Sequence, residues 1–131
     1  MIKLNGVEIK LDKYPDGTFL FKNIPPIGGW CRDNIEWFFE SMEELTAVEY
    51  ITRYCWDHRV VPNLYMPYIP DARMDRVKYE NELFTLKYFA QTINSLHFGR
   101  VEVLDPHSDV SAALFNKVHV GSPNRMIEDT V

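Results

Sequence analysis

Two polar segments of the chain carry residue types that bind phosphate groups and divalent cations. The first, residues 67–76, contains Arg73, Asp75 and Arg76 after a short apolar run. The planar guanidinium of arginine suits phosphate oxygens, and a neighbouring carboxylate can orient it or accept a hydrogen bond from a nucleotide. The same pattern is also that of a solvated loop with surface ion pairs, and the spacing alone leaves both interpretations open.

The second segment, residues 105–109, places His107 between Asp105 and Asp109. A histidine beside carboxylates at the end of a strand can ligate a divalent cation or transfer a proton. The alternative is a polar helix cap made by Ser108 or Asp109, with His107 packed beside it.

The other histidines have less promising surroundings. His58 and His119 have the settings of loop and strand-edge residues, and His97 lies near a predicted helix end, where a protonated imidazole suits the helix dipole. We predict structural or incidental roles for all three. The signature motifs of zinc proteases, P-loop NTPases, Rossmann dinucleotide-binding proteins and serine hydrolases do not occur in the sequence.

The first third of the chain predicts strands and turns. Asn5-Gly6 separates two alternating runs, which is typical of a β-hairpin, here over residues 1–11. A Pro-Asp-Gly turn precedes an aromatic run at residues 19–21, which we predict to be a strand.

The rest of the chain alternates between strand and helix patterns. Ser41 and Glu44 form a capping-box pattern, which predicts a helix from residue 42 to about residue 57. The other predicted elements are strands at 34–40, 60–66, 101–104 and 117–120 and helices at 80–97 and 109–115. The pattern at 34–40 favours a buried strand but also allows a first helical turn. This order predicts an α/β fold with a largely parallel sheet. Ligands of such sheets bind beyond the carboxyl ends of the strands, where both polar segments lie.

Composition limits the class of protein. The 131 residues suit one domain, and the net charge of −5 without a Lys/Arg cluster argues against a nucleic-acid partner. No apolar run approaches the roughly 20 residues that span a membrane, and no targeting peptide is recognisable. Cys31 and Cys55 have no CxxC spacing, so we expect free thiols and a reducing, cytoplasmic location.

Three segments together resemble one family, the ribose-phosphate pyrophosphokinases (PRPP synthetases). Residues 61–76, VPNLYMPYIPDARMDR, resemble the strand and P-Y-x-x-Y-A-R-Q-D-R loop of that family. Residues 101–109, VEVLDPHSD, resemble its strand followed by D-L-H-S, and residues 13–21, KYPDGTFLF, resemble its F-x-D-G-E segment. The order and the approximate spacing of the three segments agree with the family.

The resemblance implies a fold and an activity. The fold would be phosphoribosyltransferase-like α/β, with a mostly parallel sheet and flanking helices preceded by the N-terminal β-hairpin. Members of the family transfer the diphosphoryl group of Mg-ATP to ribose 5-phosphate, giving PRPP for nucleotide biosynthesis. Mg²⁺ and ATP are therefore the implied cofactor and substrate.

The resemblance also implies roles for individual residues on the phosphate side. Arg73 and Met74 would contact ATP, Asp75 would support their loop, and His107 would lie at the Mg²⁺ on the triphosphate.

On the adenine side, the resemblance points to a turn near the N-terminus. Tyr14, Asp16, Gly17 and Thr18 would approach the adenine bound by a neighbouring subunit. This role implies a homo-oligomer.

The sequence departs from the family in three ways. Met74 stands where the family has Gln, so one polar contact is lost, and Thr18 stands where it has Glu, which weakens the adenine contact. The family's second domain, with its acidic ribose 5-phosphate loop and its catalytic Lys/Arg loop, has no counterpart in residues 1–131. We therefore expect a single domain like the family's N-terminal domain: the ATP-side half of the enzyme, inactive alone. The alternatives are a non-catalytic oligomerisation or regulatory module of the same fold, or a different small phosphotransferase.

Overall fold

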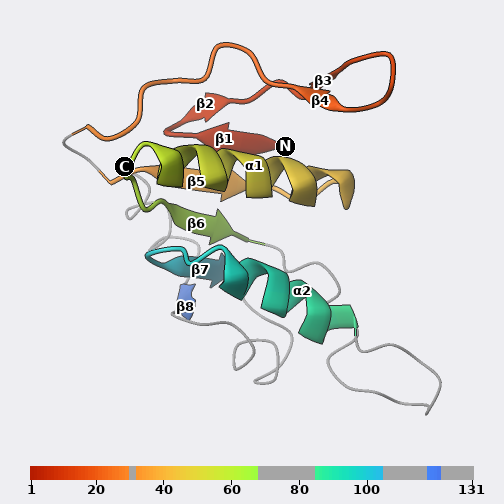
Figure 1. Ribbon diagram of the computed structural model, residues 1–131. Coiled ribbons are helices and arrows are strands. Elements are labelled where there is room, and N and C mark those ends of the chain that lie inside the picture. Colours follow the sequence, from red (N-terminus) through yellow and green to blue (C-terminus); the bar gives the residue numbers. More distant parts are fainter. Residues whose placement is uncertain (30–31, 68–84, 105–117, 122–131) are drawn as a thin grey trace.

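The computed structural model describes residues 1–29, 32–67, 85–104 and 118–121, which form two helices and two sheets (Figure 1). The elements follow the chain as β1 (Ile2–Leu4), β2 (Val7–Glu8), β3 (Asp12–Lys13), β4 (Phe19–Leu20), β5 (Asn34–Trp37), α1 (Glu43–Asp57), β6 (Asn63–Met66), α2 (Thr85–Ser95), β7 (Val101–Leu104) and β8 (Val118–Gly121). The predicted loop at residues 68–78 and the predicted helix at 109–115 lie outside the described residues. Neither described helix has the length and apolar character needed to cross a membrane.

The main sheet is mixed, which corrects the prediction of a mostly parallel sheet. Its six strands have the order β2-β1-β5-β6-β7-β8. The β5–β6, β6–β7 and β7–β8 pairs are parallel, whereas β1 pairs antiparallel with both β2 and β5. The hairpin does not precede the sheet as a separate feature but extends it. Because no helical crossover joins β1 to β5, the connection does not force these strands to run in parallel.

The turn of the N-terminal hairpin has the predicted conformation. Asn5 and Gly6 have φ values of 51° and 82°, so both central residues adopt the left-handed conformation that such turns need. The Asn5 side chain also fixes the start of β5: its amide donates to the Asp33 carboxylate at 2.9 Å, and its carbonyl oxygen accepts from the Asn34 N–H at 2.9 Å. This one turn residue therefore links the hairpin to the centre of the sheet.

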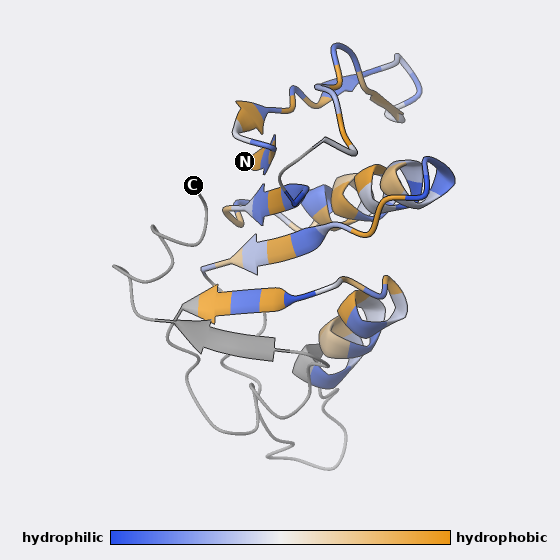
Figure 2. Ribbon diagram, turned by 90° about the vertical axis from the view of Figure 1, so that its left-hand side faces the viewer, coloured by the Kyte–Doolittle hydropathy of each residue, from blue (hydrophilic) through white to orange (hydrophobic). Residues whose placement is uncertain are grey.

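The core lies between the sheet and the two helices, which cover the same face of the sheet (Figure 2). Alternate strand residues point into it, so Ile35 and Trp37 of β5 and Leu64 and Met66 of β6 are fully buried. Phe89 of α2 packs against Trp37 with 5.9 Å between ring centroids. The residues between them point to the other face of the sheet and include polar ones such as Glu36 and Tyr65. Strands β5 and β6 are therefore amphipathic rather than apolar on both faces.

Helix α1 begins at Glu43, one residue after the predicted start, and only half of the expected capping box forms. The carboxylate of Glu44 accepts from the backbone N–H of Ser41 at 3.1 Å, but the N-cap residue is Met42 and makes no side-chain capping hydrogen bond. The spacing of Leu45, Val48, Ile51 and Cys55 in the sequence predicts one apolar face for this helix. Val48, Ile51 and Cys55 are buried, and Leu45 is partly buried against the same core.

The spacing of Leu83, Leu86, Phe89, Ala90 and Ile93 in the sequence predicts an apolar face for helix α2, and the structure describes the last three of these side chains. Phe89, Ala90 and Ile93 are buried in the core. The chain leaves the helix through His97, which has a φ of 50°. Gly99 then passes close to the start of β6: an added Cβ would approach the Asn63 side-chain oxygen to 2.8 Å. The predicted stop signal at Gly99 thus coincides with a tight approach between segments.

Candidate functional site

The turn near the N-terminus forms the tip of a separate two-stranded arm. Strands β3 and β4 pair antiparallel, with Lys13 opposite Phe19. The Tyr14 N–H donates to the Thr18 carbonyl oxygen at 2.8 Å, and the Gly17 N–H donates to the Tyr14 carbonyl oxygen at 2.9 Å. Gly17 has a φ of 89°, a conformation that glycine adopts without strain. The turn extends away from the sheet on the side where α1 begins (Figure 1).

The polar atoms of this turn converge on one carboxylate. Asp16 accepts from the hydroxyl of Thr18 at 2.7 Å and from the Thr18 backbone N–H at 3.0 Å. These two hydrogen bonds hold the pKa of Asp16 below its usual value. The result is an exposed carboxylate that stays ionised and has a fixed direction, so it can accept a hydrogen bond from an amino group or a hydroxyl of a ligand.

A cavity of about 300 Å³ separates the arm from the first half of α1. Its lining combines arm residues with helix residues: Lys13, Gly17, Thr18, Phe19, Glu43, Thr46 and Tyr50. The ammonium of Lys13 lies 2.9 Å from the Glu43 carboxylate and 5.6 Å from the centroid of the Phe19 ring. Tyr50, which lines the cavity, and Tyr14 at the tip of the arm leave 53% and 49% of their surface exposed, so both aromatic rings are available for stacking.

Sequence reasoning did not identify the helix side of this cavity. In the sequence, Glu43 indicates only the start of a helix, because it lies inside the capping-box pattern of Ser41 and Glu44. Tyr50 falls outside the apolar stripe of α1, and an exposed aromatic residue at that position was the signal that could have identified it.

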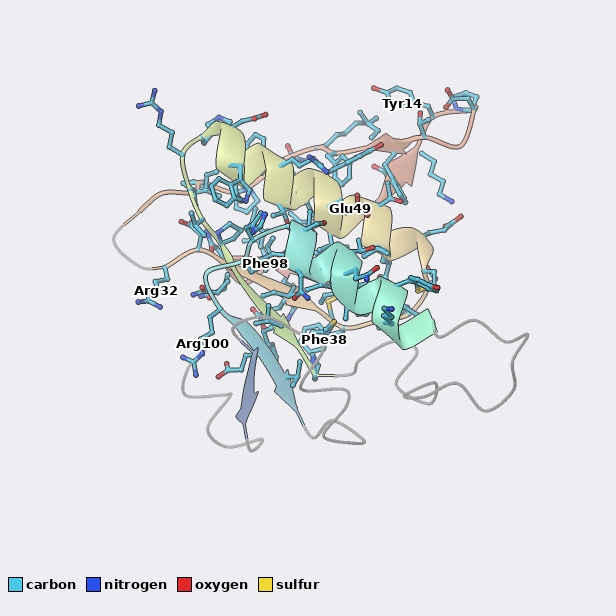
Figure 3. All side chains as sticks on the ribbon, turned by 60° about the horizontal axis from the view of Figure 1, so that its bottom comes forward. Tyr14, Arg32, Phe38, Glu49, Phe98 and Arg100 are labelled. Atoms are coloured by element: carbon cyan, nitrogen blue, oxygen red, sulfur yellow. The ribbon has the colours of Figure 1, made fainter. Side chains whose placement is uncertain are left out.

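The arm lies apart from the edge where the parallel strands start. Figure 3 shows Tyr14 far from Arg32 and Arg100, which precede β5 and β7 and so mark the amino ends of these strands. The helix residues beside the arm belong to the start of α1, which follows the carboxyl end of β5. The arm is therefore nearer to the sheet edge where ligands of α/β folds bind.

The structure describes half of the predicted site. It brings Tyr14, Asp16, Gly17 and Thr18 together in one turn. The other predicted residues lie outside the described residues: Arg73, Met74, Asp75 and His107. Within the described ranges, no group of three or more His, Cys, Asp or Glu side chains is arranged to hold a metal ion.

Comparison with known proteins gives a match at the level of structure. No family model and no curated protein sequence matches the chain. The crystal structure of phosphoribosylpyrophosphate synthetase from Mycobacterium smegmatis matches with a TM-score of 0.68 and 15% sequence identity. The match covers 93% of this chain but 42% of that protein, so the chain spans less than half of its length. The chain therefore has the fold of one part of a phosphoribosylpyrophosphate synthetase, as the three sequence segments predicted.

Proposed function

We propose that the chain is the ATP-side half of a ribose-phosphate pyrophosphokinase and is inactive by itself. In the complete reaction, the diphosphoryl group of Mg-ATP passes to the C1 hydroxyl of ribose 5-phosphate. The ribose 5-phosphate site would belong to a second domain or to another chain. The fold likeness over 93% of this chain supports the proposal.

The observation that carries the nucleotide assignment is the turn around Asp16. Its ionised carboxylate, held by Thr18, is suited to accept from the exocyclic amino group of adenine. The exposed ring of Tyr14 offers a face on which a purine can stack. In the described residues the strands of the arm pair only with each other, and an exposed ion pair joins the arm to α1. Its tip could therefore reach the nucleotide of a neighbouring subunit, as the expected homo-oligomer requires.

The phosphate side of the proposed site depends on residues outside the described ranges. Arg73 would pair with triphosphate oxygens, with Met74 beside them, and Asp75 would orient the arginine. Mg²⁺ would neutralise charge on the triphosphate. Among the described residues, Asp16 is a single carboxylate already bonded to Thr18, so the arm does not itself supply a magnesium site. His107 remains the proposed protein contact of the metal.

Calorimetric titration of the chain at high concentration tests this proposal. We expect Mg-ATP to bind in the absence of ribose 5-phosphate, and ribose 5-phosphate alone not to bind. Asp16→Asn, which keeps the size of the side chain, should weaken Mg-ATP binding. Glu49→Gln on α1, which does not line the cavity beside the arm, is the matched control and should bind like the unchanged chain.

A second candidate function is a non-catalytic oligomerisation or regulatory module. Thr18 favours it, because its hydroxyl bonds Asp16 within the turn where the related enzymes have a longer acidic residue. Met74 favours it as well. The same titration separates the two functions: no binding of Mg-ATP, together with self-association of the chain, would support the module and contradict the nucleotide site.

A further inference from the structure

The ends of α1 and α2 enclose a second groove, on the side of the sheet where β6 and β7 begin. Its volume is about 440 Å³, and known small-molecule sites span about 300–1,000 Å³. Three residues near the end of α1 and three at the end of α2 line it: Arg53, Trp56, Asp57, Ser95, Leu96 and His97. The two helices run in the same direction, so both C-terminal ends meet there (Figure 1). The groove shares no lining residue with the cavity beside the arm.

Two groups in this groove are held in fixed positions. The indole N–H of Trp56 donates to the Leu96 carbonyl oxygen at 3.1 Å, which joins the two helix ends and fixes the ring. The Trp56 residue still exposes 44% of its surface, so its ring remains available for stacking. The backbone N–H of His97 donates to the Asn94 carbonyl oxygen at 3.2 Å, which holds the chain where the imidazole lines the groove.

Charged groups of both signs line the groove without partners. Across the described ranges, the side chains of Arg53, Asp57 and His97 enter no ion pair and no hydrogen bond. Arg53 and Asp57 are four residues apart on α1, so their Cβ atoms lie roughly 5–6 Å apart on one face. The guanidinium suits a carboxylate, whereas Asp57 and the two helix C-termini favour a cation.

We propose that this groove binds a zwitterionic α-amino acid with an aromatic side chain. Arg53 pairs with its carboxylate, Asp57 accepts from its ammonium group, and its ring stacks on Trp56. A ligand with one charge leaves either Arg53 or Asp57 unpaired beside the stacked ring, which lowers affinity. The proposal goes beyond the nucleotide site and does not depend on it, because the two sites share no residue.

Calorimetry with L-phenylalanine and two truncated analogues tests the proposal. Phenethylamine lacks the carboxylate, and 3-phenylpropionate lacks the ammonium group. We expect each analogue to bind at least about tenfold more weakly than L-phenylalanine, since each loses a charge-assisted contact. Arg53→Gln should remove the preference over phenethylamine only, and Asp57→Asn should remove the preference over 3-phenylpropionate only. Trp56→Leu should weaken all three ligands.

Matched controls on the same helices are Lys87→Gln and Glu49→Gln, which remove one charge outside the groove and should leave every affinity unchanged. The proposal is wrong if L-phenylalanine does not bind at millimolar concentration, or if all three ligands bind the unchanged chain equally. Either result would mean that Arg53 and Asp57 only neutralise each other in solution. Mg-ATP titration of the Asp57→Asn variant keeps the two proposals distinct, because its nucleotide affinity should equal that of the unchanged chain.

Discussion

Glu44 joins the N-terminus of the chain to the end of β5 and the segment before α1. Its carboxylate accepts from the Met1 ammonium group, from the Trp37 indole and from the backbone N–H groups of Glu40 and Ser41. Only 6% of the residue is exposed. Burial raises the pKa of Glu44, but the hydrogen bonds outweigh burial and leave its pKa below the usual value. The charge therefore stabilises the fold.

This pKa shift makes the stability of the fold depend on pH. Because the folded-state pKa lies below the unfolded value near 4.5, the contribution of Glu44 is complete above that pH and is lost as pH falls through the folded-state pKa. Glu44→Gln should lower the free energy of unfolding at neutral pH by about 1.5–3 kcal/mol. Urea denaturation of both chains from pH 7 to pH 3 should show this difference shrinking below about pH 4.5. Glu43→Gln, at an exposed position, is the control; a difference that stays constant with pH would contradict the assignment.

Arg73 is the residue on which the proposed triphosphate contact depends most. Arg73→Ala should weaken Mg-ATP binding by about 1.5–3 kcal/mol, because a charge-assisted hydrogen bond is lost. Lys87→Ala on α2, outside the proposed site, controls for a general loss of positive charge. Calorimetry that gives equal affinities for Arg73→Ala and the unchanged chain would remove Arg73 from the site.

The proposed role of His107 is tested by the dependence of ATP binding on Mg²⁺. His107→Ala should reduce the dependence of ATP binding on Mg²⁺, since a group proposed to lie at the metal is removed. The measurement is ATP affinity with and without Mg²⁺, with His58→Ala as the control. An unchanged dependence would favour the role of a polar helix cap, the alternative for this segment.

At the scale of elements, the sequence predicted local structure well where neighbouring residues alone determine a turn or the buried face of a helix. Asn5-Gly6 determined the first hairpin, and the apolar spacing of Val48, Ile51 and Cys55 determined the buried face of α1. The pairing of β1 with β5 could not be predicted, because an antiparallel neighbour thirty residues away leaves no pattern in either strand. Likewise, Ser41 matched a capping box, but the Glu44 carboxylate is shared among several donors and the helix begins two residues later.

The hairpin turn gives a test at this scale. Gly6→Ala should lower the free energy of unfolding by about 1–2 kcal/mol, because alanine is strained at positive φ. The space around Gly6 is open, so the cost comes from backbone strain and not from a clash. Gly29→Ala is the matched control, since its surroundings are also open and its φ is not in the left-handed region. Equal thermal stability of the two variants would contradict this account of the turn.

At the scale of the whole molecule, the resemblance in three segments predicted the fold that the structural comparison confirms, whereas the candidate site was predicted only in part. The turn around Asp16 was identified from its motif. The groove between α1 and α2 was not, because Arg53 and His97 are distant in sequence and meet only through the packing of the two helices. A site formed by residues that are distant in sequence has no characteristic residue spacing by which it could be recognised.

Cys55 reports on the cooperativity of the whole fold. It is fully buried in the core, and burial, with the nearby charge of Asp33, raises the pKa of its thiol to about 11. In a Cys31→Ser background, Ellman's reagent at pH 8 should therefore react with Cys55 at least about 100-fold more slowly than with an unfolded thiol. The rate should rise with urea in parallel with global unfolding. Rapid labelling without urea would show that α1 leaves the core separately.

The arm formed by β3 and β4 has a consequence for how this protein can change over evolutionary time. In the described residues its strands pair only with each other, and its ion pair to α1 lies on the surface. Substitutions at its tip therefore cost the sheet little, and natural selection can change the tip without first supplying compensating core mutations. Thr18, where the family that the sequence resembles has an acidic residue, is the kind of substitution that such tolerance permits.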